Sequence, residues 1–391
     1  MCDELSRVAA DPAVPEANRR QFLKVLGATA AAGVVVAGGA RPARAATTGS
    51  GRKSGRTRLV LLGTAGGPAF LDGDRFGVST AIAYGDQVYV VDLGQGALLR
   101  LRQSGLAGAT GAANTWTNVR GLFFTHMHSD HLADWPAAWA TGAINAVGRS
   151  GPPIQVVGPG NRGTLPRVFP PGKPAPAVVA PEDPTPGITR MTEHLTRAWA
   201  NDFNDRARDS GFPGPASLFA VRDLDPAGWV PDPEGRPPRL TAPIPVWTDG
   251  DVRVTATLVD HHPTAPAFAF RFDTPDGSIT VSGDTAVSEN LIDLARGTDY
   301  LVHEVIDPAF ADRLAATLPA EQGVALKAHL LGAHTTIEQV GRDVAEKAGA
   351  KALVLTHQVP GNNPKRVWKA AQQGYSGRLV VGEDLMELAV R

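Results

Sequence analysis

The sequence predicts one α/β domain built on two β-sheets. Strand-like segments occur in two batches, the first from residue 58 to 157 and the second from residue 252 to the C-terminus, and both batches are mixed with helical segments. Hydrophobic residues make up 43% of the 391 residues, which is enough for a sizeable core. We find no repeat at a fixed period, which argues against a solenoid or a propeller.

Composition excludes several functional classes. The 38 basic and 39 acidic residues leave a formal net charge of -1, whereas a dedicated nucleic-acid binder usually has a clear basic excess. We therefore expect no nucleic-acid partner. The single cysteine cannot form an intrachain disulfide, a Cys-rich zinc site or an iron–sulfur cluster. The ten histidines are then the residues that most need an explanation.

Residues 1–45 resemble a twin-arginine signal peptide. Arg19 and Arg20 precede the uncharged apolar stretch 25–40, which is shorter than the roughly 20 residues of a membrane span. Small residues at positions -3 and -1 favour cleavage before Ala46. A membrane anchor or a buried helix is the alternative, but the Gly and Ala content disfavours an anchor. We expect export by the twin-arginine translocase to the periplasm or cell exterior, with no membrane span after cleavage.

Cleavage would change the composition of the mature chain. It removes the only cysteine, Cys2, together with six basic and four acidic residues, so that 32 basic and 35 acidic residues and a net charge of -3 remain. Residues 46–57 are rich in Gly, Ser and Thr and predict a disordered lead-in. The folded domain is expected to span residues 58–391.

The first half of this domain alternates short apolar runs with segments of helical spacing. Apolar runs bounded by turn residues predict strands, and the turn Gly85-Asp86 predicts a hairpin. The expected strands are 58–62, 80–84, 87–93, 119–125 and 154–157, and the expected helices are 97–105 and 132–147.

The middle of the chain is rich in proline. Eleven prolines between residues 151 and 187 predict irregular loop, and a second Pro-rich stretch covers 212–245. Between them, apolar residues repeat every four positions over 188–210 and predict one helix. We interpret 151–245 as a Pro-rich, partly helical insertion that forms a lid over the main fold and is not a separate domain.

Strand signals return at residue 252. The turn 274–277 predicts another hairpin, and Thr335 with Glu338 predicts a capping box at the start of a helix. The expected strands are 252–259, 267–272, 278–281, 300–305, 352–355, 378–381 and 385–389, and the expected helix is 336–348.

The histidines are concentrated at strand ends. A predicted strand ends at Thr125 and is followed by three histidines and an aspartate in six positions: His126, His128, Asp130 and His131. Residues two apart in an extended segment face the same way, so His126 and His128 can hold one ion, and the next two side chains can reach a second. An accidental His-rich loop is the alternative.

Three further ligand-type residues, His261, Asp284 and His357, occupy the same topological position. Each follows a short buried strand, and strand ends at one edge of a sheet commonly build sites. We predict that His126, His128 and His261 hold one ion and that Asp130, His131 and His357 hold a second, with Asp284 as the bridge. Nitrogen and oxygen ligands favour two zinc ions and, less specifically, iron or manganese.

This ligand order resembles the metallo-β-lactamase fold, from about Arg58 to Arg391. The resemblance implies a four-layer αβ/βα sandwich, a binuclear zinc centre and His334 as a catalytic histidine that does not bind metal. It also favours His261 over His262 as the ligand. Further segments resemble the ribonuclease Z branch: Leu62-Gly63-Thr64 with Arg75, Ser282 to Thr285, His303-Glu304, His334 to Thr336, and Leu355 to His357.

The sequence also departs from that branch. Ribonuclease Z normally has Ser-x-Arg-Tyr after the last metal histidine, whereas this chain has Gln358 to Pro364, and the Gly-rich arm that grips tRNA is not recognisable. Other segments resemble the arylsulfatase-like relatives: Asp260 to Pro263, Pro266 to Phe272, and His357 to Pro360.

These observations predict an exported binuclear zinc hydrolase of a small-molecule ester, with sulfate and phosphate esters as the favoured classes. In this hypothesis a metal-bridging hydroxide attacks the ester, Asp130 and Asp284 fix it, and His334 stabilises the transition state or protonates the leaving group. His303 and Glu304 are expected to orient His334 or a ligand. The alternatives are an exported lactonase or β-lactamase with the same metal site, and a non-catalytic metal- or solute-binding protein.

Several remaining residues carry weaker predictions. His194 is interpreted as a surface or pocket-lining residue, and His329 as a structural histidine. Trp135 and Trp199 either line the pocket or pack in the core. Arg75 either meets an anionic substrate or forms a surface ion pair. The oligomeric state does not follow from the sequence.

Overall fold

The computed structural model describes residues 56–67, 74–108, 115–146 and 148–390. The predicted signal peptide and most of the predicted lead-in lie outside these ranges, and the first strand begins at Thr57, at the end of that lead-in. Among the described residues, no helix combines the length and apolar character needed to cross a membrane.

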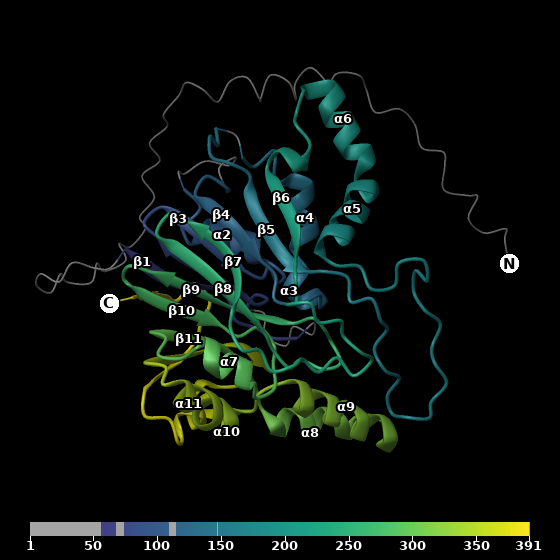
Figure 1. Ribbon diagram of the computed structural model, residues 1–391, viewed down its shortest axis with the longest axis vertical. Helices are drawn as coiled ribbons and strands as arrows, with labels where there is room; N and C mark the ends of the chain where they lie inside the picture. The colour runs from purple at the N-terminus through teal and green to yellow at the C-terminus, as the bar shows by residue number, and fades with distance from the viewer. Residues whose placement is uncertain (1–55, 68–73, 109–114, 147, 391) are drawn as a thin grey trace, which may run out of the picture. The chain divides into compact units, whose positions relative to one another are not determined.

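The described residues form two seven-stranded sheets (Figure 1). In the first sheet the order is β14-β1-β2-β3-β4-β5-β6, and the pairs from β14 to β3 are antiparallel whereas those from β3 to β6 are parallel. The strands are β1 (Thr57–Gly63), β2 (Ser79–Tyr84), β3 (Gln87–Val91), β4 (Val119–Phe123), β5 (Ile154–Pro159), β6 (Phe219–Leu224) and β14 (Glu387–Ala389).

The second sheet repeats this plan. Its order is β13-β12-β11-β10-β9-β8-β7, with antiparallel pairs from β7 to β10 and parallel pairs from β10 to β13. The strands are β7 (Ile244–Asp249), β8 (Val252–Leu258), β9 (Phe268–Thr274), β10 (Gly277–Val281), β11 (Tyr300–Ile306), β12 (Ala352–Val359) and β13 (Arg378–Val381).

The two sheets face each other across an aromatic core. Phe123 of β4 lies 5.4 Å from Phe270 and 5.3 Å from Phe272 of β9, measured between ring centroids, and all three side chains are fully buried. At one edge of this core, Asp249 of β7 accepts hydrogen bonds from Tyr89 Oη of β3 and from Nε and Nη2 of Arg120 in β4, each at 2.9 Å. These contacts join the sheets through apolar packing and one charged cluster.

Helices cover the outer face of each sheet. Buried residues of α2, α4 and α5 pack in one cluster with the first sheet, and those of α7, α10 and α12 pack in another with the second. This arrangement confirms the predicted four-layer αβ/βα sandwich. The helices are α2 (Ala97–Gln103), α3 (Ser129–Leu132), α4 (Trp135–Thr141), α5 (Ile188–Ala198), α6 (Ala200–Ser210), α7 (Glu289–Leu294), α8 (Pro308–Ala316), α9 (Ala320–Ala333), α10 (Ile337–Gln339), α11 (Glu346–Ala348) and α12 (Lys365–Trp368).

The interpretation of 151–245 as an excursion from the main fold is partly wrong. The segment supplies β5 and β6, which extend the first sheet beyond β4, and the start of β7 in the second sheet. The run 160–187 between β5 and α5 contains no helix or strand, as its prolines predict. The segment is therefore partly framework and partly loop.

Three helix predictions also need correction. The helix expected over 188–210 is two helices, α5 and α6, which meet at Trp199, and the helix expected over 132–147 is divided between α3 and α4. The capping box lies one residue later than predicted, because Thr336 and Gln339 form it. A π-helical turn, Val340–Ala345, joins α10 to α11.

Candidate metal centre

The first sheet presents four ligand-type side chains just after β4. Thr125 and His126 follow the strand, His128 is still extended with φ -72° and ψ 147°, and α3 begins at the next residue. Asp130 and His131 therefore lie in the first turn of α3. This change from extended chain to helix separates the motif into two pairs, as the sequence predicts.

The second sheet presents three more side chains on three different segments. His261 follows β8 and Asp284 follows β10. Gly283 precedes Asp284 with φ +62°, and a Cβ atom there would lie 2.8 Å from the Phe268 carbonyl oxygen. Only glycine therefore fits this turn without a shift of the neighbouring strand.

His357 lies inside β12 at an irregularity. Leu355 pairs with His303 and Gln358 with Val305 of β11, so β12 carries one extra residue between these pairs. His357 has φ +41°, a left-handed backbone that is strained for a residue with a Cβ atom. The bulge turns the His357 side chain toward the first sheet, where its Nε2 atom lies 3.3 Å from Asp130 Oδ2.

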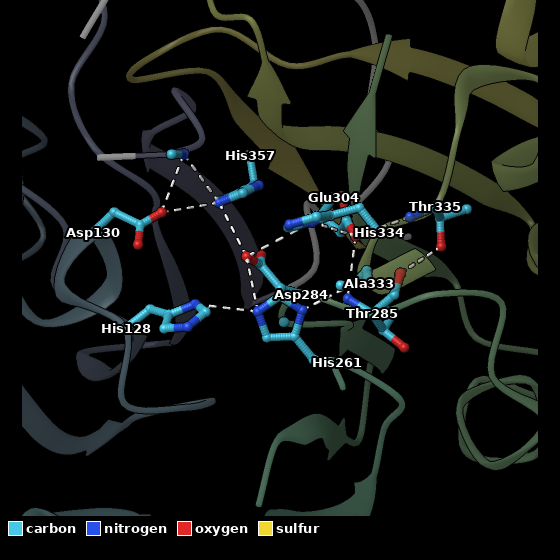
Figure 2. A network of polar contacts seen from close by, with 12 residues as sticks. His128, Asp130, His261, Asp284, Thr285, Glu304, Ala333, His334, Thr335 and His357 are labelled. Atoms are coloured by element: carbon cyan, nitrogen blue, oxygen red, sulfur yellow. Dashed lines mark hydrogen bonds and ion pairs between the residues drawn. The ribbon is translucent and has the colours of Figure 1, made fainter. Parts of the chain in front are cut away.

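The structure brings all seven predicted ligands together in two groups. The first contains His126, His128, His261 and Asp284, and the second contains Asp130, His131, Asp284 and His357. Within each group the ligand atoms lie within 4.8 Å of one another. Asp284 belongs to both groups, and Figure 2 shows its carboxylate between His261 and His357.

Asp284 Oδ2 is the common point of the two groups. It lies 3.3 Å from Nε2 of both His131 and His357 and 3.9 Å from Nε2 of both His126 and His261. A carboxylate at the centre of four imidazole nitrogens is the arrangement that a bridging ligand requires.

Buried polar atoms without partners test whether these residues fit a metal. Nε2 of His126, Nε2 of His131 and Oδ1 of Asp284 are buried and have no hydrogen-bond partner among the described residues. Leaving such atoms unpaired is costly, and a coordinated cation would satisfy all three. The donor set of five imidazoles and two carboxylates fits zinc and other divalent transition metals.

Electrostatics favour neutral imidazoles in the first group. Burial is the main cause that lowers the pKa of His128 to about 4 and holds the pKa of His126 and His261 well below the usual value. Neutral imidazoles keep a lone pair for coordination. Burial alone would raise the pKa of Asp284, but the neighbouring His357 and His131 hold it well below its usual range.

The pKa values in the second group shift in other directions, because carboxylates surround His131. Burial would lower the pKa of His131, but Asp284 and then Asp92 raise it well above the usual value. The Asp130 pKa is lowered despite burial, mainly by His131 and His357. A cation bound at Nε2 would compete with the proton that these carboxylates stabilise on His131.

Sequence reasoning missed the residues that orient the ligands. Asp92, buried at the end of β3, accepts from Nδ1 of His131 at 2.8 Å, and it also accepts from the backbone N–H and hydroxyl of Thr125 at 2.8 Å each. The Ala333 carbonyl lies 2.9 Å from His261 Nδ1. Asp92 follows a buried strand, as the predicted ligands do, and that position was the available signal.

Two glycines after β1 border the second group. A Cβ atom on Gly66 would lie 2.5 Å from His357 Nδ1, so this position admits no side chain while His357 stays in place. The Gly67 N–H points to Asp130 Oδ2 at 3.1 Å and His357 Nε2 at 3.3 Å. The loop after β1 therefore closes one side of the site.

His334 and Glu304 form a pair beside the two groups. His334 Nδ1 lies 3.1 Å from Glu304 Oε1 and 3.9 Å from Asp284 Oδ2 (Figure 2). The same Glu304 oxygen accepts from the backbone N–H groups of Thr285 and Thr335. Burial would lower the pKa of His334, but the Glu304 carboxylate and the more distant Asp284 raise it to about 9.

His303 does not join this pair. It lies on the same side of β11 as Leu301 and Val305, which pack under the helices, and its Nδ1 atom contacts the Glu304 carbonyl oxygen at 2.7 Å. Among the described residues, no hydrogen bond or ion pair joins His303 to His334 or to a predicted ligand. Of the two residues expected to orient His334 or a ligand, Glu304 is the one that contacts His334.

The other histidines lie outside both groups. His262 contacts Asp260 Oδ1 at 2.8 Å, and the exposed His194 contacts Asp183 at 2.9 Å. His329, predicted to be a structural histidine, lines the same cavity as His262. The two tryptophans with open assignments differ, because Trp135 is fully buried in the core and Trp199 is 42% exposed. Arg75 Nη1 donates to the Thr64 hydroxyl and to the Gly382 carbonyl oxygen.

We compared the sequence with protein families and with known proteins. No protein-family model matches the sequence. Ribonuclease Z of Mycobacterium bovis (strain BCG / Pasteur 1173P2) is 27% identical over 338 residues, which cover 85% of this chain and 98% of that protein. Ribonuclease Z of Mycolicibacterium gilvum (strain PYR-GCK) is 26% identical over 338 residues, which cover 85% of this chain and 96% of that protein.

Solved structures show the same fold. The metallo-β-lactamase fold protein YhfI of Bacillus subtilis superposes with a TM-score of 0.52 at 16% identity, over 85% of this chain and 99% of that chain. The short form of human tRNase Z gives a TM-score of 0.51 at 19% identity, with the same two coverages.

These comparisons correct one expectation. The near-neutral charge led us to expect no nucleic-acid partner, but the similar proteins are named ribonuclease Z and tRNase Z. That exclusion is wrong, because net charge sums over the whole chain and does not describe the local field at a substrate site.

Proposed function

We propose that this chain, a hydrolase with the metallo-β-lactamase fold, is a binuclear metal-dependent phosphodiesterase. The observation that carries the proposal is the pair of four-residue ligand groups that share Asp284, with His334 directly beside them. The names of the sequence relatives support a phosphodiester of nucleic acid as the first natural substrate to test. Sulfate esters, expected from the sequence, are a second class.

The bound cations would supply a water of lowered pKa and positive charge for the substrate oxygens. Asp130 and Asp284, held ionised, would accept hydrogen bonds from that water and orient it. Hydrolysis joins the water oxygen to phosphorus and breaks the bond from phosphorus to the leaving oxygen. That oxygen would take a proton from His334, because the Glu304 carboxylate 3.1 Å from His334 Nδ1 orients the ring and raises its pKa.

The His334→Ala variant tests this assignment. We expect it to retain the wild-type metal content and to lose about 100-fold or more in turnover, because it removes the proton donor but no ligand. His194→Ala, an exposed histidine outside both groups, is the matched control and should retain full turnover. Unchanged turnover in folded, metal-loaded His334→Ala would show that His334 does not serve this step.

A substrate panel separates the ester classes. The zinc-loaded protein would be assayed with bis-p-nitrophenyl phosphate, an RNA oligonucleotide, p-nitrophenyl sulfate, a lactone and a chromogenic cephalosporin, with metal analysis in parallel. We expect the phosphodiesters to be cleaved fastest. Inactivity on all five substrates would contradict the proposal and favour a binding protein.

We also propose that the twin-arginine signal exports the protein, which rests on Arg19, Arg20 and the apolar stretch after them. Replacing both arginines by lysine should keep the chain in the cytoplasm and uncleaved. N-terminal sequencing of the exported wild-type protein should begin at Ala46. Equal export of the wild type and the double variant would refute the assignment.

A further inference from the structure

A cavity of about 400 Å³ lies next to the candidate metal centre and has no role in the steps above. We call it the Phe169 pocket. Three of its wall residues follow or precede a site residue by one or two positions: His262 after His261, Ala286 after Asp284, and Gly332 before His334. Because three site segments also form its wall, the pocket adjoins the centre on the His334 side.

The segment between β5 and β7 builds the opposite wall. It supplies Arg167, Phe169 and Arg236, and Lys173 of the same segment pairs with Glu321 of α9 at 3.3 Å. Arg162, buried, donates to the carbonyl oxygens of Pro263 and Asp232. These contacts fix the wall against the loop that carries His261 and His262.

The chemistry of the walls selects a planar ring. The Arg167 guanidinium lies 4.9 Å from the centre of the Phe169 ring, and Phe169, which is 41% exposed, is one of the residues that line the pocket. Pro263, Ala286 and Ala328 add apolar surface. Apolar walls with an aromatic face favour stacking of a flat ring, and the volume suffices for one.

Charged groups at the rim suit the polar edge of such a ring. Arg236 contacts Asp260 Oδ2 and His262 Nε2, each at 3.0 Å, and so presents donors and acceptors close together. A ring with polar edge atoms could add hydrogen bonds to this cluster, whereas an alkyl group could not.

We propose that the Phe169 pocket is the leaving-group subsite and that it takes a planar aromatic group joined to the scissile phosphate. This inference rests on the proposed function. A nucleobase and a simple aryl ring share this chemistry, and the two arms of the experiment separate them.

Calorimetric binding to the metal-loaded protein tests the pocket without turnover. One arm compares phenyl phosphate with methyl phosphate, and the other compares adenosine 5′-monophosphate with ribose 5-phosphate. We expect the ring-bearing probe to bind about 5- to 100-fold tighter in at least one arm, and that arm identifies the source of the ring.

Variants then assign the preference to Phe169. Phe169→Ala should abolish it and Phe169→Tyr should retain it. Leu165→Ala, an exposed residue of the same segment outside this pocket, is the matched control and should bind as the wild type does. Thermal unfolding confirms that each variant is folded.

No ring preference in the wild type, or a preference that survives Phe169→Ala, would overturn the pocket assignment. Ring-dependent binding without hydrolysis of any phosphodiester would contradict the proposed function and leave the pocket standing. Equal hydrolysis of aryl and alkyl phosphodiesters would support the proposed function and contradict the pocket assignment.

Discussion

Replacing Asp92 by asparagine exchanges one carboxylate oxygen for an amide nitrogen beside His131. In the wild type, Asp92 Oδ1 accepts from the Thr125 N–H, and Oδ2 accepts from His131 Nδ1 and the Thr125 hydroxyl. His131 Nε2 is therefore free of a proton whenever the ring is neutral, and it can coordinate a metal. Asparagine tolerates the φ of +60° at this position, so the backbone need not change.

The asparagine side chain has two orientations, and both are unfavourable for metal binding. With its oxygen on the Thr125 N–H, its nitrogen faces His131 Nδ1, and the proton must move to Nε2, the ligand atom 3.3 Å from Asp284. With the amide reversed, the buried Thr125 N–H loses its acceptor, at a cost of about 1–3 kcal/mol. That cost corresponds to roughly 5- to 150-fold, which agrees with the 10- to 100-fold typical of residues that orient metal ligands.

Competition with a chromogenic zinc chelator measures the effect. On the proposed binuclear site, we expect Asp92→Asn to bind zinc at the second ligand group about 10- to 100-fold more weakly. Asp249→Asn is the matched control, since it makes the same exchange in another hydrogen-bonded carboxylate, which binds Arg120 at the start of β4, whereas the ligands follow the end of that strand. Wild-type zinc affinity in folded Asp92→Asn would refute the reasoning.

Two further predictions concern the site loop and the contact between sheets. Gly66→Ala should lose one metal per chain, counted by metal analysis, because its Cβ atom would displace His357; Gly214→Ala, with open space around it, should retain both. Asp249→Asn should lower the free energy of unfolding at neutral pH by about 1.5–3 kcal/mol, measured by urea titration. Hydrogen bonds from Arg120 chiefly lower the pKa of Asp249, so its contribution is present above about pH 4 and lost as the pH falls through the lowered pKa. The difference between the wild type and Asp249→Asn should therefore shrink in acid, and a constant difference down to pH 2 would contradict this account.

The ligands could be predicted because their pattern is local. His126, His128, Asp130 and His131 occupy six positions, and the spacing of two in an extended chain fixes which pair faces together. His261 and Asp284 each follow a short apolar run that predicts a buried strand. Strand ends therefore placed these segments without knowledge of the pairing between strands, and the family resemblance decided between His261 and His262.

The residues that support the ligands could not be predicted in this way. Asp92 contacts His131 across 39 positions of sequence, and Gly66 meets His357 only because β12 carries a bulge. Both contacts depend on strand register, which a single sequence does not determine.

Helix errors have a different origin. The pair α8 and α9 was missed although Asp307 and Pro308 form a recognisable N-terminus, with the Asp307 side chain accepting from the Ala309 N–H. The repeat of four in α5 and α6 continues across Trp199, so periodicity alone did not reveal the break. The Pro-rich composition of 151–245 likewise concealed the strand β6, whereas β5 was predicted at 154–157.

Each ligand group draws side chains from both sheets. His128 and His261 are 133 residues apart in the chain, and Asp130 and His357 are 227 apart. A cation in either group would therefore act as a cross-link that closes a very long loop and removes much of the freedom of the unfolded chain. Because residues 46–391 contain no cysteine, no disulfide can make such a cross-link within that range, and metal coordination would supply it instead.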